Sequence, residues 1–182
     1  MHTPDRFPNF EALSFLAQQY PELEISSIEP FIALLKVSAR LESEIESYFQ
    51  KLGFSRGRFM VMMLLLRHPE RPLHPAEIAK ALGVRRSTMT GLLDTLEGKG
   101  WVDRVEVPAD RRSWAIMLTK AGRAELDQIL PGHYKRMSEA MSGIDQKERQ
   151  TLIQLLGKVS QGLQVFIDYQ PEATDEPSSR HH

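Results

Sequence analysis

The chain has 182 residues, of which 41% are hydrophobic and 26% are charged, and its formal net charge at pH 7 is −1. This composition fits an ordinary globular domain with a hydrophobic core, and it argues against a disordered chain. The sequence contains no cysteine, which excludes disulfides, cysteine-ligated metal sites and any thiol-based oxidation switch.

Neither a secretion signal nor a membrane span is predicted. The longest apolar run covers residues 59–66 and is too short to cross a bilayer. The N-terminus lacks the basic start and apolar core of a secretory signal. We therefore expect a cytoplasmic protein that does not associate with membranes.

Charge is distributed unevenly along the chain. Between Arg71 and Arg123 there are ten Lys and Arg against six Asp and Glu, a net charge of +4, which leaves −5 for the remainder. A basic module in an otherwise acidic chain is typical of a protein in which one part faces nucleic-acid phosphates. The near-neutral total argues against a protein that coats nucleic acid indiscriminately.

The N-terminal part is predicted to be helical. Residues 1–27 form an arm with a short helix from Asn9 to Gln19, which we expect to pack on the chain itself or on a partner subunit. A role of this arm in ligand gating is the alternative. Apolar residues then keep a helical period from Ile28 to Leu52, which predicts a helix of about seven turns that needs a partner along its length.

Three shorter helices are predicted next. Ser55 is the expected N-cap of a helix that reaches Arg67, and the prolines of residues 69–72 end it. The second helix covers residues 74–82 with Pro75 at its first position, and Gly83 makes the turn that follows.

The third helix, Arg86–Glu97, has two contrasting faces. Its apolar residues recur at helical spacing and predict one buried stripe, formed by Met89, Leu92, Leu93 and Leu96. Small residues occupy the opposite face, namely Ser87, Thr88, Thr90 and Gly91. Short hydroxyl side chains near a helix N-terminus can approach bases and phosphates closely, whereas a solvated face usually carries long Glu and Lys.

A β-hairpin is predicted after this helix. Gly98 and Gly100 are expected to end the helix, because glycine enters the left-handed C-cap conformation without a Cβ penalty. Residues 102–107 and 114–118 read as paired strands, joined by a turn, residues 108–113, that carries Arg111 and Arg112. Arginine at an exposed hairpin tip suits insertion into a narrow minor groove.

The C-terminal part returns to helix. Thr119 is the expected N-cap of a helix that continues beyond Arg136 with a kink at Pro131-Gly132. Asp145 and Glu148 predict a capping box at the start of the last helix, which has an apolar face through Phe166. Residues 28–54 and 119–169 are therefore expected to form a dimerisation region, although a monomer could close them on its own core. Residues 170–182 are predicted to be a disordered tail.

These features together resemble the MarR family of bacterial transcription regulators. The family pattern of Asp-x-Arg in the wing, followed by Leu-Thr-x-x-Gly, is matched by Asp110-Arg111-Arg112 and by Leu118-Thr119-Lys120-Ala121-Gly122. A weaker similarity extends from about Ile28 to Ile167. The resemblance implies a mainly α-helical fold with a small β-hairpin wing (α+β), in which residues 55–118 form a winged helix-turn-helix between N- and C-terminal dimerisation helices.

The resemblance also implies a function. Members of the family are homodimers that bind double-stranded DNA, usually as repressors released by a small molecule. A two-fold dimer would place two reading helices about one turn of duplex apart, which predicts a palindromic operator. The expected DNA-binding residues are Arg85, Arg86, Ser87, Thr88, Thr90, Gly91, Asp110, Arg111 and Arg112. Arg112 is expected in the minor groove, with Asp110 holding its guanidinium or the turn, and Arg111 either contacts a phosphate or faces solvent. Lys99 and Arg104 are expected to stabilise the wing root locally, with a phosphate contact as the alternative.

Two positions depart from the family pattern. Arg85 stands where relatives usually carry a Ser or Thr N-cap, and Ser87 is the alternative cap one turn later. Gly91 stands where many relatives place a long basic or polar side chain, so this helix is expected to read fewer bases and to depend more on DNA shape.

An effector pocket is implied by the resemblance alone. Relatives bind aromatic acids and other lipophilic compounds where the dimer helices meet the DNA-binding module. The matching residues here are Ser38, Arg40, Phe59, Met62, Met63 and His133. The alternative is that these residues only fill the core.

Enzyme chemistry finds no support in the sequence. The six histidines have no metal-ligand spacing, and neither a phosphate-binding loop nor a nucleophile elbow occurs. We therefore expect no catalytic residue, metal or cofactor. The competing hypothesis is a winged-helix module that binds a protein and has lost DNA binding.

Overall fold

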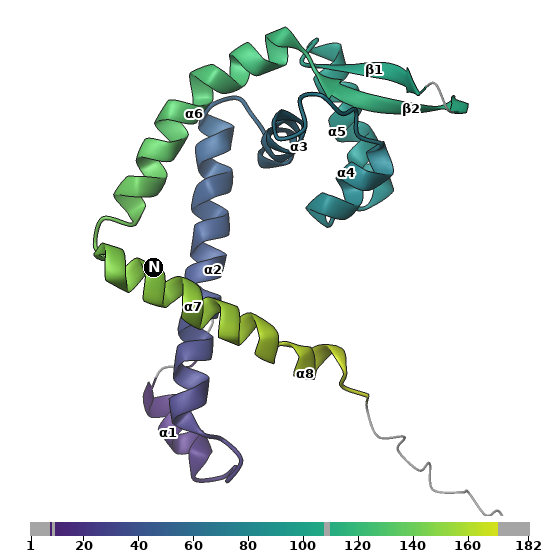
Figure 1. Cartoon of the computed structure of the whole chain (residues 1–182). Helices are drawn as coiled ribbons and strands as arrows, with labels where there is room; N and C mark the ends of the chain where they lie inside the picture. Colours follow the sequence, from purple (N-terminus) through teal and green to yellow (C-terminus); the bar gives the residue numbers. More distant parts are fainter. Residues whose placement is uncertain (1–7, 9, 108–109, 171–182) are drawn as a thin grey trace, which may run out of the picture. The chain divides into compact units, whose positions relative to one another are not determined.

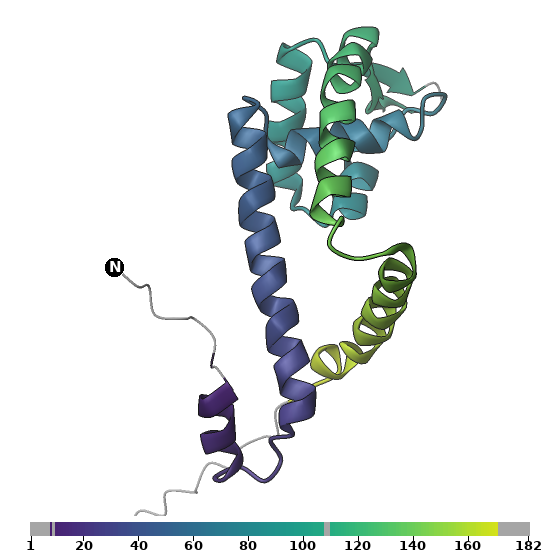
Figure 2. The same ribbon diagram turned by 90° about the vertical axis from the view of Figure 1, so that its left-hand side faces the viewer.

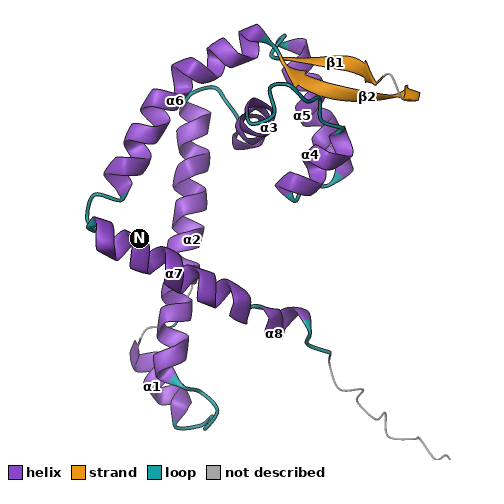
Figure 3. Cartoon of the chain, in the orientation of Figure 1, coloured by secondary structure: helices purple, strands orange, loops and turns teal. Residues whose placement is uncertain are grey.

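The computed structural model describes residue 8 and residues 10–107 and 110–170; the side chains of residue 10 and of residues 107–113 are not described. The predicted tail, apart from residue 170, lies outside the described residues, as does the start of the N-terminal arm. The described part consists of helices and one antiparallel hairpin, as Figure 3 shows. The elements are α1 (Phe10–Ala17), α2 (Ile25–Lys51), α3 (Arg56–Leu66), α4 (Pro75–Leu82), α5 (Arg86–Gly98), β1 (Val102–Val107), β2 (Asp110–Leu118), α6 (Lys120–Ala140), α7 (Gln146–Gly162) and α8 (Gln164–Ile167). The predicted fold class is confirmed.

The chain divides into two compact units, residues 1–127 and residues 128–182. In the first unit, α3, α4, α5 and the hairpin gather at one end of α2, while α1 lies beside the other end of that helix (Figures 1 and 2). The division into arm, dimerisation region, DNA-binding domain and tail stays a prediction. None of the described helices is long and apolar enough to cross a membrane.

The core of the first unit joins the hairpin to the three short helices. Fully buried side chains come from α3, α4, α5 and both strands, and they are Val61, Met62, Leu65, Ile78, Met89, Leu93, Leu96, Val102 and Ile116. Leu126 of α6 is also fully buried. Each of these side chains stabilises the fold by about 1.5–3 kcal/mol relative to an exposed position. The exposed residues of α5 are therefore presented by a tightly packed scaffold.

The caps of three helices follow the sequence expectation. Ser55 Oγ accepts a hydrogen bond from Arg58 N at 3.2 Å, which begins α3. The capping box of α7 is present, with Asp145 Oδ1 accepting from Glu148 N at 2.9 Å and Glu148 Oε2 accepting from Asp145 N at 2.7 Å. In α4, Pro75 occupies the first position after the N-cap residue His74.

The boundaries of α2 and α6 differ from the prediction. α2 begins at Ile25 rather than Ile28, because the Glu24 carbonyl already accepts hydrogen bonds from the amides of residues 27 and 28. α6 is one helix through Pro131, so the chain does not leave the helix at Pro131-Gly132, and the kink predicted there stays a prediction. Proline removes a single backbone donor, and Arg136 Nη1 adds a hydrogen bond to the Gly132 carbonyl at 2.9 Å.

α5 ends at Gly98, in the Gly98–Gly100 segment where its end was predicted. The left-handed conformation expected of these glycines is found not at Gly98 but at Gly100, with a φ of +69°. A left-handed backbone at this position favours glycine because it has no Cβ. The reversal leads the chain directly into β1.

The hairpin is longer than predicted on its second strand. Asp110–Ser113 were expected in the connection, but β2 begins at Asp110. The register runs from Val102 opposite Leu118 to Glu106 opposite Trp114, and Val107 then faces Asp110. This register shift places three residues of β2 between two successive pairs. Local composition does not reveal such a shift, because it depends on how the two strands pair.

Candidate nucleic-acid interface

The second helix of the helix-turn-helix, α5, has one face in the core and one face in solvent. Met89, Leu93 and Leu96 are buried, and Leu92 is half-buried. The residues predicted to contact DNA from α5 and its N-cap position are exposed, and they are Arg85, Arg86, Ser87, Thr88, Thr90 and Gly91. The apolar stripe thus holds the helix in place without covering the small polar face.

No side chain among the described residues caps the N-terminus of α5. Arg85 occupies the N-cap position, and its side chain makes no cap hydrogen bond. Ser87 lies inside the helix, so the alternative in which it caps the helix one turn later is wrong. An uncapped helix start leaves backbone N–H groups and the positive end of the helix dipole available to an anion such as a DNA phosphate.

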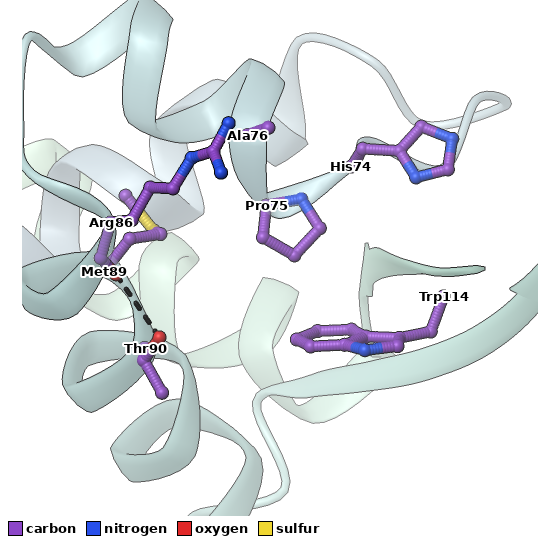
Figure 4. Close-up of a pocket in the computed structure, with 7 residues that line it drawn as sticks. All are labelled: His74, Pro75, Ala76, Arg86, Met89, Thr90 and Trp114. Carbon is purple, nitrogen blue, oxygen red and sulfur yellow. Dashed lines mark hydrogen bonds between the residues drawn. The ribbon is translucent and has the colours of Figure 1, made fainter. Parts of the chain in front are cut away.

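The hydroxyl of Thr90 is already used as a donor. Thr90 Oγ1 donates to the Arg86 carbonyl at 3.1 Å, one turn earlier in α5 (Figure 4). A threonine that donates to its own helix retains its acceptor capacity. Thr90 can therefore accept a hydrogen bond from a base amino group while its proton stays with the helix.

The start of α4 is anchored by Glu77. Glu77 Oε2 accepts from the His74 amide at 2.8 Å, and Glu77 Oε1 lies 3.2 Å from Arg71 Nη1. The hydrogen bond from the His74 amide, with the contribution of Arg71, lowers the pKa of Glu77 below its ordinary value. Glu77 is thus charged at neutral pH and holds the first turn of the helix that precedes α5.

The motif Leu-Thr-x-x-Gly joins the wing to α6. Thr119 Oγ1 donates to the Gly100 carbonyl at 2.7 Å and accepts from the Gly122 amide at 3.0 Å, while the Thr119 amide donates to the Trp101 carbonyl at 3.0 Å. Gly122 lies so close to Trp101 that an added Cβ would stand 2.1 Å from the Trp101 carbonyl oxygen. The motif is therefore a backbone-to-backbone contact that only glycine permits.

A further contact supports the wing from the other side. Leu73 and Ile116 exchange two backbone hydrogen bonds, of 3.0 and 2.9 Å, which attach the segment before α4 to β2. Sequence reasoning missed this bridge. The prolines at residues 72 and 75 favour extended backbone at the residues before them, but they do not indicate which strand this segment pairs with.

Arg104 and Lys99 make local contacts at the wing root, as expected. The Arg104 guanidinium is paired with Asp94 and Glu97 of α5. Lys99 Nζ lies 4.4 Å from the ring centre of Trp101. Trp101 in turn stacks on Phe54 with ring centres 5.1 Å apart.

An open groove of about 440 Å³ lies between the start of α5 and Trp114 on β2. Figure 4 shows the indole of Trp114 on one side and Arg86 and Thr90 on the other, with Pro75 between them. The complete lining is His74, Pro75, Ala76, Arg86, Met89, Thr90 and Trp114. The start of α5 and the hairpin are thus two projections on either side of the groove, and Arg104 connects them farther along the helix.

The three wing residues predicted to contact DNA lie on β2, but their side chains fall outside the described residues. The backbone places Asp110, Arg111 and Arg112 at the start of the strand, at the end of the hairpin far from α6 (Figure 1). Their expected contacts therefore stay predictions.

The residues expected in an effector pocket have varied surroundings. In the first unit, Phe59 and Met62 are buried core residues, Met63 is half-buried, and Ser38 and Arg40 are exposed on α2. His133 belongs to the second unit, where burial, with a contribution from Arg136, lowers its pKa. The described residues contain no cluster of three or more potential metal ligands.

The exposed polar face of α5, the preceding α4 and the hairpin define a winged helix-turn-helix protein. Comparison with known proteins shows which family of winged helix-turn-helix proteins this chain resembles. Residues 52–113 match the model of the MarR family. The chain is 35% identical over 161 residues to the HTH-type transcriptional repressor YetL of Bacillus subtilis, covering 88% of this chain and 96% of the relative. It is 30% identical to the HTH-type transcriptional regulator PecS of Dickeya dadantii, covering 83% and 94%.

A solved structure agrees with this match. Sco3205, a MarR family transcriptional regulator from Streptomyces coelicolor solved in complex with DNA, superposes with a TM-score of 0.69 over 84% of this chain and 96% of that one, at 24% identity. The chain therefore belongs to the MarR family of transcriptional regulators, as its motifs indicated. The prediction that it is not an enzyme agrees with this assignment.

Proposed function

We propose that this chain is a cytoplasmic, homodimeric transcriptional repressor that binds a specific DNA operator. The observation that carries the proposal is the exposed, small polar face of α5, held by a buried stripe beside the hairpin. The basic balance of residues 71–123 supports it, because DNA affinity depends on neutralising phosphates. The repressor YetL and the DNA complex of Sco3205 support it by analogy.

The proposed contacts follow from the two projections. Ser87, Thr88 and Thr90 approach base edges in the major groove, and the small Gly91 leaves room for close approach. Arg85 and Arg86 contact phosphates near the helix start. In the wing, Arg112 enters the minor groove, Asp110 orients it, and Arg111 contacts a phosphate.

A second copy of this chain is the proposed cover for the apolar face of α7. Among residues 128–170 no side chain is buried. The exposed apolar residues of α7, of its C-cap and of α8 include Leu152, Leu155, Leu156, Val159, Leu163 and Phe166. An exposed face of this size is typical of a subunit interface. A two-fold dimer then presents two copies of α5 to successive major grooves.

Selection of bound genomic DNA from a fragment library tests the proposal directly. The expected product is a palindromic sequence whose half-sites are about one helical turn, roughly 10 base pairs, apart. Recovery of single, unpaired half-sites would contradict the dimeric arrangement. Failure to retard any fragment at low salt would instead favour a winged-helix module that binds a protein, the alternative suggested by Gly91 and the near-neutral total charge.

Replacing Arg112 with Ala is expected to weaken operator binding by about 1–3 kcal/mol. The reason is the loss of a guanidinium from the minor groove, where the negative potential is concentrated. Electrophoretic mobility shift at constant salt measures the effect, and Arg123→Ala, which removes an equal charge from α6, is the control. Unchanged operator affinity of the Arg112 variant would remove the wing contact from the proposal.

Release by a small effector completes the proposal. It is supported by the family and by the methionines of α3, whose flexible side chains adapt to flat rings. Arg40 is the proposed partner of an effector carboxylate, with Ser38, Phe59, Met62, Met63 and His133 as the other pocket residues. A thermal-shift screen of aromatic acids tests this part, and the absence of stabilisation by every compound would indicate a regulator without an effector.

A further inference from the structure

Arg104 on β1 contacts α5 and β2 at the same time. Its Nη2 lies 2.5 Å from Asp94 Oδ1, and its Nε lies 2.9 Å from Glu97 Oε2. Its Cζ lies 4.2 Å from the ring centre of Trp114 on β2. Asp94 and Glu97 are three residues apart and thus share one face of α5. One planar guanidinium therefore connects the helix to both strands of the wing, and we call these four residues the brace.

We propose that Arg104 is a positioning residue that sets the orientation of the wing relative to α5. This inference rests on the proposed function, in which α5 and the wing contact adjacent grooves of one duplex. Trp114 is two residues from Arg112 along β2. The contact of Arg104 with the Trp114 indole therefore restrains the strand that carries the proposed minor-groove arginine. A rigid guanidinium that is bidentate and stacked holds geometry better than a flexible ammonium.

The surroundings of Arg104 argue against two simpler roles, namely a stabilising ion pair and a phosphate contact. Its side chain is 36% exposed, and those of Asp94 and Glu97 are 57% and 41% exposed. Ion pairs this open to solvent contribute little to stability. With two carboxylates and one guanidinium, the charged groups of the brace sum to −1, so the brace does not attract phosphate. The remaining role of Arg104 is geometric, namely to link α5 to the wing.

The double variant Asp94→Ala/Glu97→Ala separates geometry from charge. Alanine is a good helix former, so α5 is expected to persist. The variant loses two negative charges, so its net charge rises by two units. By electrostatics alone, this change strengthens DNA binding. The brace predicts the opposite for the operator, a loss of about tenfold, while affinity for unrelated DNA stays equal or rises. Operator affinity equal to or above wild type, with an unchanged specificity ratio, would overturn the inference.

A matched control keeps the charge change but leaves the brace intact. Asp127→Ala/Glu139→Ala breaks two exposed ion pairs of α6, with Arg123 and Lys135, and adds the same two units of charge. Its operator affinity is expected to equal or exceed that of wild type. An equal loss of operator affinity in this control would count against the brace.

The salt dependence of the single variant Arg104→Gln tests the phosphate alternative. Loss of the brace lowers operator affinity but leaves the slope of log affinity against log salt unchanged. A slope reduced by about 1 would identify a lost phosphate contact and overturn the inference. Arg104→Lys is expected to recover only part of the affinity, because an ammonium cannot reproduce the bidentate and stacked geometry.

A measurement without DNA separates this inference from the proposed function. Trypsin cleavage after Arg111 and Arg112, mapped by mass spectrometry, reports how firmly the wing is held. The Asp94→Ala/Glu97→Ala variant is expected to be cut there several times faster than wild type, with an unchanged melting temperature. Equal cleavage rates would refute the brace even if the protein binds its operator. Failure of the wild type to bind DNA would refute the proposed function alone.

Discussion

Replacing Gly122 with Ala is expected to lower the free energy of unfolding by about 3 kcal/mol, the upper end of the usual cost of overpacking. The added Cβ would lie 2.1 Å from the Trp101 carbonyl oxygen and 2.9 Å from Leu118 Cδ1. The carbonyl is backbone and is already bound by the Thr119 amide, so it cannot move away without breaking that hydrogen bond. The strain therefore falls on the junction between the wing and α6.

Denaturant unfolding at one fixed protomer concentration measures this effect, because the stability of a dimer depends on concentration. Gly98→Ala is the matched control. Gly98 is helical and has open space where a Cβ would be placed, so its replacement is expected to leave stability unchanged or to raise it by up to about 1 kcal/mol. Equal stabilities for the Gly122 variant and wild type would show that the close approach to Trp101 is not a real constraint.

Replacing Ser87 with Asp is expected to weaken operator binding by two orders of magnitude or more, because placing like charges together at an interface costs several kcal/mol. Ser87 is the second residue of α5 and is exposed. In the proposed complex the new carboxylate faces bases and phosphates. At the same position it complements the helix dipole, which stabilises the folded protein by about 0.3–1 kcal/mol. Affinity and stability therefore change in opposite directions, which excludes unfolding as the cause.

Mobility shift and thermal unfolding of the same preparation test this prediction. Gln146→Glu is the control, because it adds one negative charge at the first residue of another helix, α7. That variant is expected to bind the operator within about twofold of wild type, since α7 is not part of the proposed DNA-contacting surface. Tight operator binding by the Ser87 variant would contradict the placement of α5 in the major groove.

Secondary structure could be predicted where its signals are local. The apolar stripe of α5, the proline at the start of α4 and the capping box of α7 each depend on residues within one or two turns. Errors occurred where a boundary depends on pairing or on the next element. The register shift in β2 and the continuous path of α6 through Pro131 are examples.

The exposure of the candidate site on α5 was predictable, but the contacts that support it were not. The residues expected to meet DNA on α5 are exposed, as the two-faced pattern indicated. The brace and the Leu73–Ile116 bridge were missed, because each joins residues from different elements, and a single sequence carries no signal for their proximity. The contacts of the wing arginines stay predictions.

By itself, the sequence determined the class of this protein, since helical periodicity, capping residues and the wing motif are read from neighbouring residues. Only the tertiary structure decided why the motif requires Gly122 and how α5 is connected to the wing. The physical reason is that both depend on atoms brought within contact distance by the fold. The Trp101 carbonyl lies against Gly122, and one guanidinium lies between two carboxylates and an indole.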